Sequence, residues 1–253
     1  MPVSEVKVGT CGFQKSRKRH YEDLDAVEVQ QTFYDPPSSE RLKSWRNEAP
    51  KGFEFTVKAW MLLTHGYNKR LWRRLKRSVP GSPERYGGFR LTEENIYAWE
   101  ETLAAAEALE ARIIVVQTPP SFGPSAENAE RIAGFFQAVD TRGYLVVWEP
   151  RGAWWSDRRL LYRVAKTSGL YIAGDVMRGR RPPIDQEILY ARLHGLGGGE
   201  VNYRYKYSDE DLARLRDIVG NGGWSVAYVM FNNVHAYEDA LRFKIMIREN
   251  TIK

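Results

Sequence analysis

The sequence is poor in cysteine and histidine, and this scarcity excludes several kinds of site. Cys11 is the only cysteine among 253 residues, so neither an internal disulfide nor a zinc site built on several cysteines can form. The chain has four histidines, too few for a three-metal cluster at strand ends. We therefore predict no metal and no cofactor, with a single magnesium or manganese ion on Glu149 and Asp175 as the alternative.

Long hydrophobic runs and flexible linkers are also missing. The longest apolar runs, such as residues 113–116, are far too short to cross a bilayer. Residues 1–7 alternate apolar and polar groups, unlike a signal peptide. No Pro-, Gly- or Ser-rich linker separates two halves. We accordingly expect one domain over residues 1–253, located in the cytoplasm and without a membrane partner.

What the chain does contain is enough apolar material for a sizeable core. Hydrophobic residues make up 43% of it and charged residues 28%, which argues against intrinsic disorder. Lysine and arginine outnumber aspartate and glutamate by 38 to 32. The resulting net charge of +6 allows an acidic partner without requiring one, so the placement of the charges matters more than their sum.

Short apolar or β-branched runs alternate with helical patterns along the chain. Several runs are almost continuously apolar, as in residues 113–116 and 145–148, which is typical of parallel strands covered on both faces. Apolar residues at helical spacing predict a helix over 93–112, and Ser208 before three acidic residues predicts the N-cap of another. The predicted strands are Val6–Gly9, Ala26–Gln30, Glu54–Lys58, Arg112–Gln117, Tyr144–Glu149, Leu170–Asp175, Ile188–His194 and Ser225–Phe231.

Eight such strands in one chain of this length predict a single (β/α)8 barrel of the TIM type. Residues 59–91 form a longer irregular excursion after the third strand. On pattern alone an open, doubly wound sheet is the alternative. It is weakened because no GxGxxG motif follows the first strand.

Polar residues stand at or just after the ends of these strands. In a (β/α)8 barrel the loops that follow the strands form the functional face, so we expect these side chains to meet a ligand there. The predicted substrate-binding residues are Thr10, Glu28, Gln30, Lys58, Gln117, Arg151, Trp154, Arg192, Asn232 and Asn233. The predicted catalytic residues are Glu149, His194 and Asp175.

These segments resemble those of the YecE-like family, a group of (β/α)8 barrels of unknown function. The matching strings are GTCGF (9–13), VEVQQTFY (27–34), FEFTVKA (53–59), VQTPPSF (116–122), WEPRGAW (148–154), YARLHG (190–195) and MFNN (230–233). Two positions depart from the family pattern: Gln30 stands where the family usually has asparagine, and residues 15–19 are basic rather than aromatic-rich. The resemblance implies the barrel and a pocket, and leaves the reaction open.

Each catalytic candidate has a structural alternative. Glu149 would serve as general base or acid, or it forms an ion pair with Arg151, two residues away. His194 would transfer a proton, or it is a hydrogen-bonded part of the scaffold. Asp175 binds a metal or holds Arg192, and we favour the second. For Lys58, binding of an anion or an ion pair is favoured over a Schiff base.

Basic residues gather in three segments that follow strands. The predicted phosphate- or nucleic-acid-binding residues in them are Arg17, Lys18, Arg19, Arg70, Arg73, Arg74, Arg178 and Arg180. Arginine forks suit phosphate, and the neighbouring aromatic residues suit bases or sugar rings. The alternative is a solvated loop surface without a ligand.

Two hypotheses for the function follow. In the first, the protein is an enzyme that acts on an anionic small molecule of phosphorylated, sugar or nucleotide-like character, with Arg151, Arg192 and Lys58 as its anion clamp. In the second, it is a non-catalytic binder of single-stranded nucleic acid. Carboxylates at strand ends would weaken the affinity for a polyanion, and this favours the enzyme.

Overall fold

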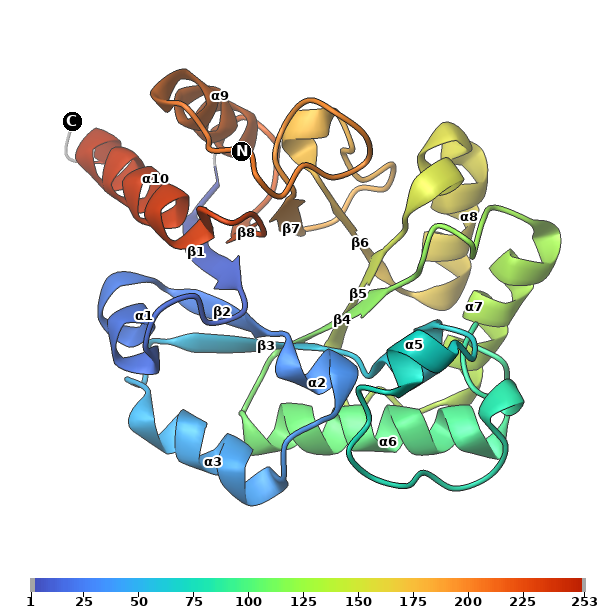
Figure 1. Cartoon of the computed structure of the whole chain (residues 1–253). Coiled ribbons are helices and arrows are strands. Elements are labelled where there is room, and N and C mark those ends of the chain that lie inside the picture. The colour runs from blue at the N-terminus through green and yellow to red at the C-terminus, as the bar shows by residue number, and fades with distance from the viewer. Residues whose placement is uncertain (1–2, 252–253) are drawn as a thin grey trace. The chain divides into compact units, whose positions relative to one another are not determined.

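The computed structural model describes residues 3–251, in which eight parallel strands form a closed barrel (Figure 1). The strands neighbour one another in chain order, and β8 pairs with β1. They are β1 (Glu5–Cys11), β2 (Ala26–Val29), β3 (Glu54–Lys58), β4 (Ile113–Gln117), β5 (Leu145–Glu149), β6 (Tyr171–Gly174), β7 (Ile188–Leu193) and β8 (Val226–Phe231). The predicted (β/α)8 fold is thereby confirmed.

Helices lie between the strands. The α-helices are α1 (Arg17–Asp23), α2 (Gln31–Tyr34), α3 (Ser39–Glu48), α4 (Met61–Thr64), α5 (Lys69–Trp72), α6 (Glu93–Ala108), α7 (Ala126–Ala138), α8 (Arg158–Ser168), α9 (Asp209–Gly220) and α10 (Ala236–Thr251). Short 3-10 helices are η1 (Pro83–Arg85), η2 (Gly152–Ser156) and η3 (Val176–Arg178). No helix within residues 3–251 is both long enough and apolar enough to span a membrane.

Several predicted boundaries shift for local reasons. The helix predicted to reach residue 112 ends at Ala108, because Glu110 adopts a left-handed φ of 50°. The strand predicted to include Gln30 stops one residue earlier, since Gln30 has helical backbone angles and precedes α2. The predicted basic loop after β1 is partly wrong, because Arg17–Arg19 lie in α1, where the Ser16 side chain caps the helix.

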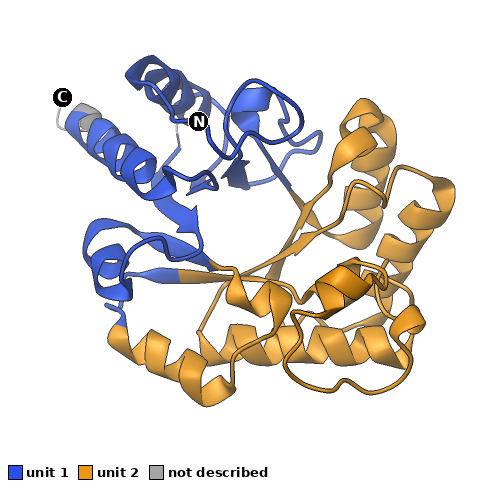
Figure 2. Ribbon diagram, viewed as in Figure 1, with its two compact units in different colours: residues 1–28, 49–54, 173–253 blue, residues 29–48, 55–172 orange. Residues whose placement is uncertain are grey.

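By internal packing the chain divides into two compact units, which Figure 2 colours separately. Unit 1 comprises residues 1–28, 49–54 and 173–253, and unit 2 comprises residues 29–48 and 55–172. In unit 1, Leu212 of α9 and Phe243 of α10 belong to the same buried cluster as Leu189 and Val229 of the strands. In unit 2, α3 packs on α6 and α7 packs on α8.

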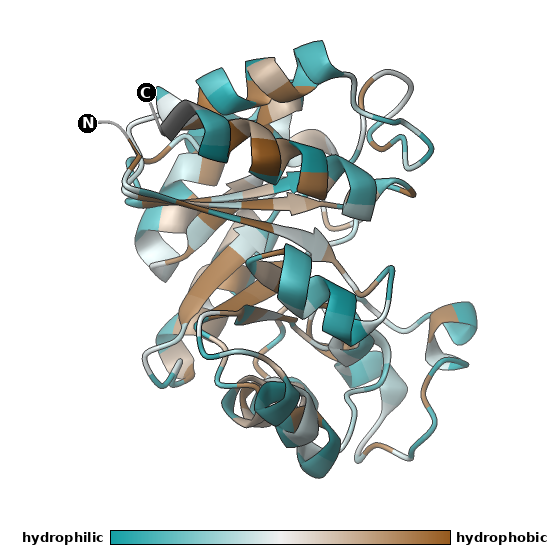
Figure 3. Cartoon of the chain, turned by 90° about the vertical axis from the view of Figure 1, so that its left-hand side faces the viewer, coloured by the Kyte–Doolittle hydropathy of each residue, from teal (hydrophilic) through white to brown (hydrophobic). Residues whose placement is uncertain are grey.

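The distribution of hydropathy differs between the strands and the helices. In Figure 3 hydrophobic residues dominate the strands, whereas hydrophilic residues cover much of the helical surface. The capping box at the start of α9 bears out the predicted N-cap: the Ser208 side chain accepts from the Asp211 N–H, and the Asp211 side chain accepts from the Ser208 N–H. The segment over 59–91, predicted to be irregular, contains the short helices α4, α5 and η1.

Candidate functional site

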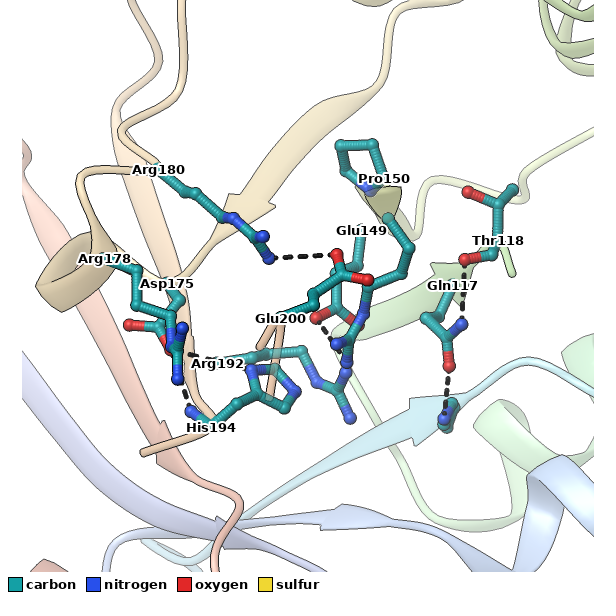
Figure 4. A network of polar contacts seen from close by, with 12 residues as sticks. Gln117, Thr118, Glu149, Pro150, Asp175, Arg178, Arg180, Arg192, His194 and Glu200 are labelled. Atoms are coloured by element: carbon teal, nitrogen blue, oxygen red, sulfur yellow. Dashed lines mark hydrogen bonds and ion pairs between the residues drawn. The ribbon is translucent and has the colours of Figure 1, made fainter. Parts of the chain in front are cut away.

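In unit 2 a lysine and a glutamine join the ends of two strands. Lys58 at the end of β3 donates from Nζ to Gln117 Oε1 at the end of β4, over 2.9 Å. The Gln117 amide in turn donates to the Thr118 carbonyl over 2.9 Å, a contact visible in Figure 4. Lys58 Nζ also lies 4.0 Å from the centre of the Phe33 ring, so the buried cation is held by an amide and an aromatic face.

Glu149 and Arg151 form an ion pair just beyond β5, as their spacing in the sequence allows. Arg151 Nη2 lies 3.0 Å from Glu149 Oε1, and both residues are buried. Glu149 is in register with Gln117 on the neighbouring strand. A carboxylate, an amide and an ammonium group therefore occupy the ends of three consecutive strands, β5, β4 and β3.

Unit 2 also contains a pocket of about 590 Å³. Its wall is formed by segments that follow β2, β3 and β4. The lining residues are Tyr34, His65, Gly66, Tyr67, Asn68, Arg70, Leu71, Arg74, Pro119 and Ser121. Phe33 connects the pocket to the strand ends, because its ring contacts the rings of both Tyr34 and His65 while Lys58 lies over its face.

Two arginines, Arg70 and Arg74, line this pocket. Arg70 and Arg74 are exposed, and among the described residues neither forms an ion pair with a carboxylate. Arg74 stacks on Tyr34 with 4.3 Å between the guanidinium carbon and the ring centre. Of the described residues that line the pocket, none is acidic. The pocket consequently carries an uncompensated positive charge, which favours an anion.

His65 presents a neutral imidazole at the pocket. The pKa of His65 is lowered to about 3, mainly by burial and to a smaller extent by the positive charge of Lys58. Its Nδ1 lies 2.8 Å from the Thr64 hydroxyl. At physiological pH the ring is thus uncharged, so it offers hydrogen bonds rather than positive charge to a ligand.

The lowered pKa of His65 predicts a stability change with pH. In the unfolded chain His65 binds a proton below its usual pKa of about 6.5. In the folded chain it binds this proton only near pH 3. The free energy of unfolding should therefore decrease as the pH is lowered, by about 2 kcal/mol between pH 7 and pH 5 on account of His65. Urea unfolding of the wild type and of His65→Gln at both pH values measures the difference.

The buried His20, whose pKa is lowered as well, is present in both proteins, so comparing them isolates His65. If His65→Gln loses as much stability as the wild type on acidification, the neutral state of His65 is not the cause.

In unit 1 the strand ends hold a fully buried ion pair. Arg192 of β7 donates two hydrogen bonds to the carboxylate of Glu28 on β2, from Nε to Oε2 over 2.8 Å and from Nη2 to Oε1 over 2.7 Å. The Tyr190 hydroxyl donates to the same carboxylate over 3.1 Å. The expected pair of Asp175 with Arg192 is wrong for the described residues, because the fork of Arg192 matches the carboxylate of Glu28.

Asp175 instead positions the segments that follow β6 and β7. Its Oδ2 accepts the backbone N–H of His194 over 2.9 Å and lies 3.7 Å from Arg178 Nε (Figure 4). Arg178 donates to the carbonyls of Gly195, Gly197 and Gly199 over 2.6–2.8 Å. Gly195 is required there, since its φ is +79° and a Cβ would lie 2.1 Å from the Asn202 carbonyl oxygen.

The remaining candidates lie in structural surroundings. The Thr10 hydroxyl donates to the Gly12 carbonyl over 2.9 Å. The Asn233 amide donates to Asp239 and to the Tyr205 carbonyl, and the Asn232 N–H bonds to Leu193. Trp154 is fully buried in unit 2, with its ring 4.8 Å from that of Trp148. Binding roles for these residues remain predictions.

The three basic segments have different surroundings. Arg178 and Arg180 are engaged inside unit 1, the latter with Glu200 over 3.1 Å (Figure 4). Lys18 on α1 lies 3.9 Å from Glu22. The excursion of unit 2 is the segment that contributes to the pocket, through Arg70 and Arg74, while Arg73 is exposed beside them.

Of the residues that line the pocket, sequence reasoning had predicted only Arg70 and Arg74 as site residues. It missed the polar and aromatic members Tyr34, His65, Tyr67 and Asn68. His65 follows β3 by seven residues, directly after the short helix α4, and its ring contacts that of Phe33. The density of aromatic and basic residues in the excursion was the available signal. Within residues 3–251 no group of three or more His, Cys, Asp or Glu side chains is arranged to hold a metal ion.

The closed strand order and the polar groups at the strand ends define a (β/α)8 barrel of the TIM type. The family model described as "Protein of unknown function DUF72" matches residues 13–253, and the chain belongs to this family. The YecE-like resemblance refers to the same family.

Solved structures agree with this assignment. A DUF72 protein from Enterococcus faecalis V583 has a TM-score of 0.71 at 19% identity, covering 98% of this chain and 99% of that chain. One from Thermotoga maritima MSB8 has a TM-score of 0.69 at 24% identity, covering 96% and 99%. Endonuclease IV from Thermus thermophilus shares the fold with a TM-score of 0.53 at 12% identity, covering 97% and 99%. No curated protein matches the chain.

Proposed function

We propose that the ends of β3, β4 and β5, together with the pocket of unit 2, form an active site for an anionic substrate. The observation that carries this proposal is the pair of arginines in a concave pocket, Arg70 and Arg74, without a carboxylate partner among the described residues. The exposed Arg142, which lines no part of the pocket, has such a partner in Glu100. A phosphate or carboxylate group would complete the charge balance of the pocket.

The other side chains suggest how the substrate is held. Tyr34 and Tyr67 offer ring faces to a sugar or a base, and Asn68 and the neutral His65 offer hydrogen bonds. Lys58 and Gln117 lie at the strand ends behind Phe33 and would contact the reacting end of the substrate. Glu149 supplies a carboxylate that can take a proton from it, with Arg151 holding the carboxylate in place.

The test is a binding screen of anionic small molecules, including sugar phosphates, nucleotides and carboxylates, by isothermal titration. Arg70→Gln and Arg74→Gln should each weaken the best ligand by about tenfold to a hundredfold, because each removes a charged hydrogen bond. Arg41→Gln is the matched control, since Arg41 is also exposed and stacks on an aromatic ring, Trp45, outside the pocket. Equal affinities for all variants would contradict the proposal.

Binding of single-stranded nucleic acid is the second candidate. It is favoured by Arg73, which is exposed and lines no part of the pocket, so that a strand could reach it and a small ligand need not touch it. Single-stranded oligonucleotides therefore belong in the same screen across a salt series. Micromolar affinity without turnover, and a salt slope that falls by about one unit per arginine removed, would support this candidate over the enzyme.

A further inference from the structure

A second, smaller cavity of about 210 Å³ adjoins the pocket within unit 2. The two share Gly66, Pro119 and Ser121 as a common wall. The smaller cavity contains two more arginines, Arg90 and Arg131, and of its described lining residues none is acidic. The cationic surface of the first pocket therefore continues into a second compartment.

The two arginines of the smaller cavity lie close enough to repel each other. The pKa of Arg90 is lowered, mainly by burial and to a smaller extent by the positive charge of Arg131. Arg90 donates from Nη2 to the Tyr86 carbonyl, whereas its buried Nε has no hydrogen-bond partner among the described residues. Arg131 pairs with Glu127, one turn earlier on α7, whose side chain is 71% exposed. An anion between the guanidinium groups would relieve the repulsion and satisfy the Nε of Arg90.

We propose that this smaller cavity is a second anion subsite, so that the ligand of unit 2 is a nucleotide with two separate phosphate groups. This inference rests on the proposed function and specifies its substrate class. Arg70 and Arg74 would hold one phosphate and Arg90 and Arg131 the other. The residues that the two cavities share, Gly66, Pro119 and Ser121, have small side chains, and the ribose would lie over them. The rings of Tyr34 and Tyr67 offer a stacking surface for the base.

The experiment compares two probes, adenosine 3′,5′-bisphosphate and adenosine 5′-monophosphate, by isothermal titration at low ionic strength. We expect the wild type to bind the bisphosphate at least about tenfold more tightly, because the second phosphate gains charged hydrogen bonds. Arg131→Gln should remove this advantage and leave the affinity for the monophosphate unchanged. Arg70→Gln should weaken both probes.

Arg142→Gln is the control for Arg131→Gln, since Arg142 also pairs with an exposed glutamate but lines neither cavity. Arg131 is preferred to Arg90 for the test, because Arg90 also bonds to the backbone and its loss can disturb the loop. An unchanged bisphosphate affinity in Arg131→Gln would overturn the second subsite.

The failure of this inference and of the proposed function can be told apart. If neither adenosine nucleotide binds while another phosphorylated compound of the screen does, through Arg70 and Arg74, the nucleotide assignment is overturned and the proposed function stands. If both nucleotides bind equally well, the second phosphate subsite is overturned and the proposed function stands. If no anionic compound binds, both proposals fall.

Discussion

Replacing Glu149 by glutamine should lower kcat on the substrate found in the anion screen by about 10²–10⁴-fold, with KM little changed. The substitution keeps the shape of the side chain and an oxygen for Arg151, which lies 3.0 Å away, but removes the group that accepts a proton. Steady-state kinetics with circular dichroism as a check on folding measures the effect. The acidic limb of the pH–rate profile should disappear as well, which a purely structural role would not produce.

Glu130→Gln on the exposed face of α7 is the control and should leave kcat unchanged. A variant Glu149→Gln that retains full turnover would remove Glu149 from the mechanism. The ion pair with Arg151 would then be a structural contact that holds the ends of the β5 segment.

Replacing Arg192 by methionine should reduce the free energy of unfolding by about 3–5 kcal/mol, because it leaves the carboxylate of Glu28 buried without its partner. Both residues are fully buried, so water cannot take the place of the guanidinium group. Urea denaturation followed by fluorescence gives the free energy and its slope, which should not change.

Two further variants make this expectation specific. The double variant Glu28→Gln/Arg192→Met should recover more than half of the loss, since the buried charge is gone and Tyr190 keeps an acceptor. Arg216→Met breaks an exposed pair with Asp217 and should cost less than about 1 kcal/mol. A loss of that small size in Arg192→Met would mean that Glu28 is neutral or hydrated in the folded protein.

Within residues 3–251, Arg192 of unit 1 is paired with a carboxylate, whereas Arg70 of unit 2 is not, and this difference indicates which unit binds the ligand. The buried polar groups of unit 1 are joined to each other, as Arg192 to Glu28 and Asp175 to the His194 N–H. The arginines of the unit 2 pocket have no such carboxylate partners among the described residues. A group already neutralised in the folded chain has less to offer a ligand, so we look for the ligand first in unit 2.

The sequence by itself determined the barrel and the positions of most strand ends. Apolar runs such as residues 113–116 and 145–148 are local signals, and so are the cap at Ser208 and the seven family strings. Lys58, Gln117 and Glu149 were predicted as site residues for the same reason, because each stands at the end of a strand that local composition reveals. Their catalytic or binding roles, and the single domain over residues 1–253, stay predictions.

Only the tertiary structure decided which charged residues are engaged with other parts of the chain. Glu28 and Arg192 are 164 positions apart, and Arg180 and Glu200 are 20 apart, so no local pattern marks them as partners. Arg70, Arg74 and Arg178 look alike in the sequence, yet glycine carbonyls hold Arg178 while the other two line a pocket. The physical reason is that ion pairing and pocket formation depend on side chains from distant segments. Hydrophobic periodicity records only which face of each segment is buried.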